Sequence, residues 1–68
     1  MIDFKTIRFN SDAQGQTGLS SLVNKYLDAM IDDNWHCVSE FRQHDKESSK
    51  LQKQPVYVNV ITMCKYIN

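Results

Sequence analysis

Five side chains in this sequence are of the types that bind metals or carry out nucleophilic catalysis. They are His36, Cys37, His44, Asp45 and Cys64. His36 and Cys37 are adjacent in a predicted strand, so their side chains point to opposite faces and cannot share one metal ion. His44 and Asp45 fall in a polar loop that does not orient them. We therefore expect no metal ion and no cofactor, and we interpret the histidines as solvated.

The two cysteines do not have the setting of a reactive thiol. A nucleophilic thiol needs a positive and accessible environment, whereas Cys37 shares its predicted face with Trp35 and Phe41. Cys64 lies next to Lys65, but adjacent strand residues face opposite ways. We expect both thiols to be free, buried packing groups in a reducing compartment. The chain contains no C-x-x-C, glycine-rich phosphate loop, nucleophile elbow or H-E-x-x-H, and we expect no enzymatic activity.

The charges do not favour a nucleic acid or a membrane as partner. Eight acidic and eight basic residues cancel over the 68 residues, so no overall field attracts an anionic polymer or surface. A basic tract runs through Arg42, His44, Lys46, Lys50 and Lys53, but Asp45 and Glu47 partly neutralise it and no aromatic residue interleaves. No apolar stretch reaches the roughly 18 residues of a membrane span, and the first residues lack a signal-peptide pattern. The expected location is the cytoplasm.

The pattern of apolar residues predicts a single α+β domain of order β-α-β-β. We expect strands at about 2–9, 35–42 and 56–67, a helix at about 18–33 and a polar loop at 43–54. The helix has an unbroken apolar stripe from Leu19 to Ile31, with Thr17 as N-cap and Asn34 in the left-handed position that ends it. The most apolar strand should be central, which gives an antiparallel sheet of order 1-3-2 with the helix on one face.

The alternation of apolar and polar residues is irregular in the first predicted strand and regular in the second. In the first strand, the alternation changes phase near Lys5, so either a bulge restores it or the strand is apolar on both sides. In the second strand, Trp35, Cys37 and Phe41 share one face, and we expect that face to pack on the helix.

The junction between helix and second strand resembles a group of small uncharacterised bacterial βαββ domains. The matching residues are Leu22, Val23 and Asn24 in the helix, then Asp33-Asn34-Trp35, followed by Cys37 and Val38. In that group a glycine precedes the tryptophan, where this chain has Asn34. The resemblance implies the βαββ fold and a bacterial source, for which we consider a mobile genetic element. It implies no function, because the role of the group is unknown.

The last strand is the most informative segment, because it is apolar on both faces. Val56, Val58, Val60, Cys64 and Tyr66 alternate with Tyr57, Ile61, Met63 and Ile67. A strand of this kind needs cover above and below, and one helix covers only one side. We expect the valine row under the helix, since small branched side chains permit a close approach. The predicted oligomer interface is then the other row with its neighbours: Ile7, Val38, Tyr57, Ile61, Met63 and Ile67.

These observations predict a non-enzymatic small interaction protein that forms a homodimer through its uncovered sheet face, with loops free for an unidentified protein partner. One alternative is a small-ligand binder or minor enzyme with a pocket at the dimer interface, where His36 or Tyr57 supplies the polar group. Another is a monomer in which the 43–54 loop folds back over the sheet with Leu51 as a plug.

Overall fold

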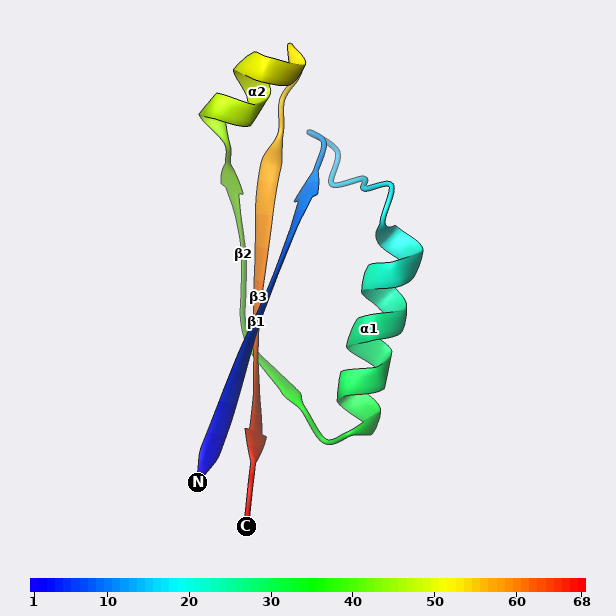
Figure 1. Ribbon diagram of the computed structural model, residues 1–68, viewed down its shortest axis with the longest axis vertical. Coiled ribbons are helices and arrows are strands. Elements are labelled where there is room, and N and C mark those ends of the chain that lie inside the picture. Colours follow the sequence, from blue (N-terminus) through cyan, green and yellow to red (C-terminus); the bar gives the residue numbers. More distant parts are fainter.

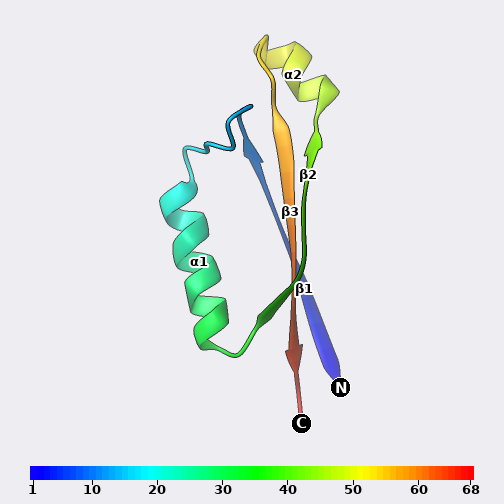
Figure 2. The same ribbon diagram turned by 180° about the vertical axis from the view of Figure 1, so that it is seen from behind.

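The computed structural model describes all 68 residues as one layer of sheet with one helix beside it and a second helix at its end (Figures 1 and 2). The elements in chain order are β1 (Ile2–Ser11), α1 (Ser20–Asp32), β2 (His36–His44), α2 (Lys46–Gln52) and β3 (Tyr57–Tyr66). The fold class is therefore α+β, as predicted, with one more helix than the sequence pattern indicates.

The sheet has the predicted topology. Its order is β1-β3-β2, and β3 pairs antiparallel with both neighbours. The pairing of β1 with β3 runs from Ile2 opposite Tyr66 to Ser11 opposite Tyr57 without interruption. β1 therefore contains no bulge, and its change of phase means that it carries apolar side chains on both faces.

Helix α1 begins two residues later than predicted and ends as predicted. Leu19 occupies the N-cap position without a side-chain hydrogen bond. Thr17, the predicted cap, instead accepts from the backbone amide of Leu19 in the preceding turn, at 3.2 Å. At the other end, Asn34 has a φ of 66°, and the amide of Trp35 donates to the carbonyl of Met30 at 2.9 Å. This is the hydrogen bond of a Schellman motif.

Strand β2 contains a bulge that the sequence did not reveal. Cys37 pairs with Met63 and Ser39 pairs with Thr62, so Val38 is an extra residue without a partner. An extra residue shifts every later side chain to the opposite face. The prediction that Phe41 shares a face with Cys37 and Trp35 is therefore wrong: Phe41 points away from α1.

Helix α2 occupies most of the segment that we predicted to be a polar loop. The carboxylate of Asp45 caps it by accepting from the amide of Ser48 at 3.0 Å, and Lys53 ends it in the left-handed conformation. The helix lies beyond the end of the sheet, far from both termini (Figure 1). Leu51 is 85% exposed, so the alternative in which this segment covers the sheet with Leu51 as a plug is wrong.

The helix covers the face of the sheet opposite to the one that we expected. The core cluster consists of Met30, Trp35, Ile61 and Met63, with Ile7, Phe9 and Leu27 packed against it. The Schellman turn delivers Trp35 directly from α1 to β2, and the register then places Cys37 beside Met63. The row of Met63 therefore faces α1. The helix packs on large side chains and not, as we expected, closely against the small valines.

The shape is long and thin, with little interior. The principal extents are 47 × 22 × 15 Å and the radius of gyration is 13.9 Å, whereas a compact chain of this length has a radius of about 11 Å. Eight of the 68 residues are buried. A chain this small is marginally stable even when compact, so this shape favours additional cover from outside the chain. No helix has the length and apolar character needed to cross a membrane.

Candidate functional site

The two cysteines lie on opposite faces of the sheet and are both free. Cys64 is buried, as predicted, on the face away from α1, where His36 is its neighbour on β2. Cys37 lies on the face toward α1 and is exposed, so the prediction that it is buried is wrong. The reason is that β2 is an edge strand whose residues are all exposed, so no neighbouring element covers this thiol.

His44 and Asp45 serve the junction between β2 and α2. The ring of His44 lies 5.2 Å from that of Tyr57, and its Nε2 is 3.2 Å from the Ser49 hydroxyl. Asp45 accepts from the backbone amide and the hydroxyl of Ser48, and the backbone hydrogen bond holds the pKa of Asp45 below its usual range. Nowhere do three His, Cys, Asp or Glu side chains come close enough together to hold a metal ion.

The basic tract is divided between the sheet and α2. The guanidinium of Arg42 stacks 4.0 Å above the Tyr57 ring and donates to the backbone carbonyl of Asp12, which ties the β1–α1 loop to β2. Lys46 and Lys50 belong to α2, and Lys53 ends it. Arg42 thus has a structural contact, while the lysines surround a solvent-exposed helix.

Trp35 forms a second structural junction, at the end of α1. Its buried ring has the ammonium of Lys5 at 4.9 Å and that of Lys65 at 6.0 Å. Lys65 also forms an ion pair of 3.1 Å with Asp33, and its hydrogen bond lowers the pKa of Asp33. Charges from β1, β3 and the helix end therefore fix the indole, which anchors α1 to the sheet.

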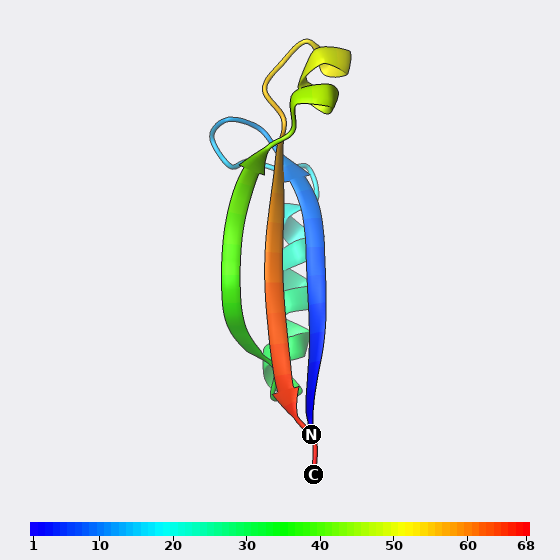
Figure 3. The same ribbon diagram turned by 90° about the vertical axis from the view of Figure 1, so that its left-hand side faces the viewer.

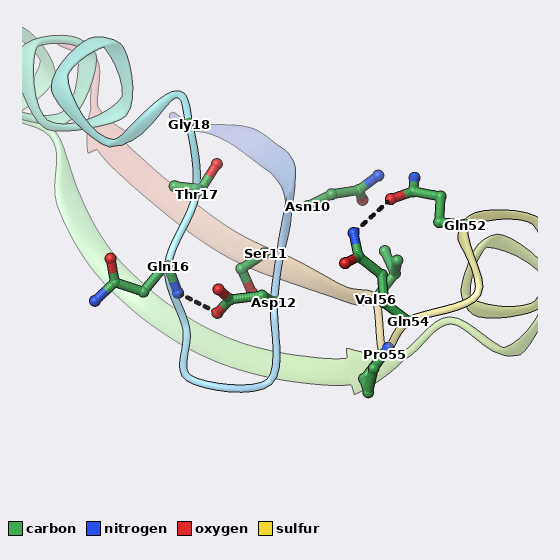
Figure 4. Close-up of a pocket in the computed structure, with 10 residues that line it drawn as sticks. All are labelled: Asn10, Ser11, Asp12, Gln16, Thr17, Gly18, Gln52, Gln54, Pro55 and Val56. Atoms are coloured by element: carbon green, nitrogen blue, oxygen red, sulfur yellow. Dashed lines mark hydrogen bonds between the residues drawn. The ribbon is translucent and has the colours of Figure 1, made fainter.

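A polar pocket of about 230 Å³ opens where two loops meet at the end of the sheet. Figure 4 shows Asn10 and Ser11 on one side and Gln52 and Gln54 on the other. Their polar atoms bind within the protein: Gln54 donates to Gln52 at 3.3 Å, and the hydroxyl of buried Ser11 accepts from Asn59 at 2.7 Å. The pocket is a hydrogen-bonded junction of loops. The sequence could not reveal it, because no pattern relates residues 10–18 to residues 52–56.

A second hollow, the β1–α1 groove, is apolar and has a volume of about 380 Å³. It lies between edge strand β1 and the first two turns of α1, because the helix reaches the core only through Leu27 and Met30, nearer its C-terminal end. Six of the seven lining residues are apolar; the lining consists of Ile7, Arg8, Phe9, Leu19, Leu22, Val23 and Tyr26. The amphipathic pattern predicted these helix side chains as covered, yet Leu19, Leu22 and Tyr26 are exposed.

The side of the sheet opposite α1, which we call the open face, has no element over it (Figure 3). Four residues of the predicted interface are absent from this face. Ile61 and Met63 are buried under α1, Ile7 packs against that core, and Tyr57 lies beneath Arg42. The assignment of these four to an uncovered surface is wrong, because α1 covers Ile7, Ile61 and Met63, while Arg42 and His44 pack against Tyr57. Val38 is the unpaired bulge residue and Ile67 follows β3 in the Met63 row, so the strand pairing places neither on the open face, although both are exposed.

On the open face, two aromatic side chains project beyond the buried side chains of the central strand. Its central row on β3 contains Val60 and Cys64, which are 7% and 6% exposed. Phe4 on β1 lies beside Cys64, and Phe41 on β2 lies beside Val60. These phenylalanines are 60% and 52% exposed. Thr62 separates the two buried side chains, so the exposed apolar groups of this face are the rings themselves, and exposed aromatic side chains are enriched at protein–protein interfaces.

Comparisons of the chain with protein-family models, curated proteins and solved structures find no match. The resemblance to bacterial βαββ domains therefore stays a prediction.

Proposed function

We propose that this protein is a non-enzymatic interaction protein that forms a homodimer through the open face. The observation that carries the proposal is the pair of exposed rings, Phe4 and Phe41, which project from a sheet face that no element covers, beside the buried side chains of Cys64 and Val60. In a monomer these rings remain in water, whereas a second copy removes them from it.

The size of the open face supports a second copy as its cover. Three strands about 4.8 Å apart and ten residues at about 3.3 Å each give roughly 470 Å² of projected surface per copy. Two facing copies then bury roughly 940 Å², close to the roughly 1,000 Å² at which specific interfaces begin, before any contribution from the projecting side chains. The thin shape agrees with this, because two sheets packed about 10 Å apart form the interior that one copy lacks.

Substitution of Phe41 by aspartate tests the proposal. Phe41→Asp places a charge at the interface, so we expect a folded monomer where the wild type is a dimer, measured by light scattering on a sizing column. Leu51→Asp is the matched control, because Leu51 is exposed on α2 away from the open face. A dimer that survives Phe41→Asp, or that Leu51→Asp dissociates, contradicts the proposal.

The free cysteines indicate the cellular compartment. The free thiols Cys37 and Cys64 are typical of a reducing compartment, and we propose the cytoplasm. A protein partner bound outside the open face remains part of the proposal. The resemblance favours a bacterial source, and a mobile genetic element is a separate part of the proposal.

The β1–α1 groove supports a second candidate function, the binding of a small apolar ligand. Its apolar lining and volume are in the range of ligand pockets. A ligand that binds only the folded state raises the melting temperature. We expect small aromatic hydrocarbons to raise it for the wild type but not for Leu22→Glu. Equal shifts in both proteins exclude the groove as the binding site.

A further inference from the structure

Four side chains at the edges of the open face form a rectangle whose two diagonals differ in chemistry. The pairing places Phe4 and His36 on either side of Cys64, and Arg8 and Phe41 on either side of Val60. Directly opposed residues of antiparallel strands share a face. The four side chains thus mark a rectangle, with both phenylalanines on one diagonal and Arg8 and His36 on the other. Its sides are about 13 Å along the strands and about 10 Å across them.

This arrangement is complementary to itself. When two copies meet face to face about a two-fold axis in the plane of the interface, the axis exchanges the two diagonals. The phenylalanines of one copy then meet Arg8 and His36 of the other, so the projecting rings do not collide with each other. A guanidinium over a phenyl ring is a favourable contact.

Two axes satisfy this condition, one along the strands and one across them. The charge of α2 favours the second. An axis along the strands places the two α2 helices side by side, although Lys46–Lys53 contains three lysines and one glutamate. An axis across the strands separates these helices by the length of the sheet. It also brings each α2 toward the partner's other end, where Asp3, Asp32 and Asp33 are balanced by Lys5, Lys65 and the N-terminal ammonium, so like charges are not brought together.

We propose that the dimer is a two-fold sandwich in which the β3 strands of the copies cross antiparallel at Thr62, midway between Phe4 and Phe41 along the sheet. This inference depends on the proposed function, since it describes how the second copy is seated. In this geometry Phe4 of each copy lies over Arg8 of the other, and Phe41 over His36. Thr62 faces Thr62 on the axis, and Val60 faces Cys64.

Cross-linking through single cysteines tests the geometry. In a Cys37→Ser, Cys64→Val background, Thr62→Cys should be joined efficiently by a short bis-maleimide, because the two copies of residue 62 face each other. Tyr66→Cys alone should not be joined, since its two copies lie roughly 26 Å apart. A mixture of Val58→Cys and Tyr66→Cys proteins should give the mixed cross-link.

The possible outcomes distinguish a wrong two-fold axis from the absence of a dimer. Self-linking of Tyr66→Cys as well as Thr62→Cys indicates the parallel arrangement and overturns the proposed axis. A dimer that shows no link at residue 62 overturns the sandwich, while Phe41→Asp still tests the open face. A monomeric wild type overturns the proposed function. If Cys64→Val does not fold, Cys37→Ser alone provides the background, because Cys64 is buried.

Discussion

At the scale of single residues, Met63 should contribute most to the core, because it is the most completely buried side chain, at 1% exposed. We expect Met63→Ala to lower the free energy of unfolding by about 2–5 kcal/mol, measured by urea denaturation at fixed protein concentration. Leu51→Ala should change it by less than about 0.5 kcal/mol, since Leu51 makes little contact. Equal effects of the two substitutions contradict the placement of the core under α1.

Asp45 should make stability depend on pH in acid. Its pKa is lowered in the folded protein, so its contribution is complete above the unfolded value of about 3.9 and disappears as the pH falls through the lower folded value. Asp45→Asn keeps a capping group that does not titrate in this range. The stability of the wild type relative to Asp45→Asn should therefore fall below about pH 4. A difference that stays constant from pH 7 to pH 2 excludes this role.

Residue patterns predicted the local chemistry of Asn34 and Trp35 but not of Val38. A left-handed asparagine and a large aromatic group at the end of a helix act through short-range geometry, which the sequence displays directly. The bulge at Val38 has no such signal, because β2 alternates acceptably in either register until β3 pairs with it. That one residue decides whether Phe41 lies on the face toward α1 or on the open face.

At the scale of elements, the turn after α1 should be sensitive to the residue at position 34. An L-residue without a local hydrogen-bonding side chain pays about 1 kcal/mol or more in the left-handed region, so Asn34→Ala should lower the free energy of unfolding by that amount. Asn34→Gly should leave it nearly unchanged or raise it. Thermal and urea unfolding of both variants provide the measurement. Equal destabilisation by the two substitutions excludes backbone conformation as the cause.

The elements themselves show where sequence reasoning ends. The strand order follows from the two-sided apolar character of β3, and α1 from its periodic stripe. Helix α2 was missed because its only large apolar residue, Leu51, gives no periodicity; the cap formed by Asp45 and Ser48 was the available signal. The face that α1 covers could not be deduced, since both rows of β3 are apolar. The turn geometry at Trp35 makes that choice.

At the scale of the whole molecule, one helix is insufficient for a sheet whose central strand is apolar on both sides. Helix α1 is anchored near its C-terminal end and covers the Met63 row, while the open face keeps Phe4 and Phe41 in water. In the proposed dimer, a second copy supplies the missing layer and converts a thin sheet into a sandwich. The β1–α1 groove lies on the other side of the sheet and stays accessible in such a dimer.

The most direct test is the solution mass of the wild-type protein, measured by light scattering on a sizing column over a range of concentrations. The dimer proposal predicts twice the chain mass of 7.9 kDa, with dissociation only on dilution. A folded protein that keeps the mass of one chain at every concentration contradicts the proposal, because the open face then needs no cover.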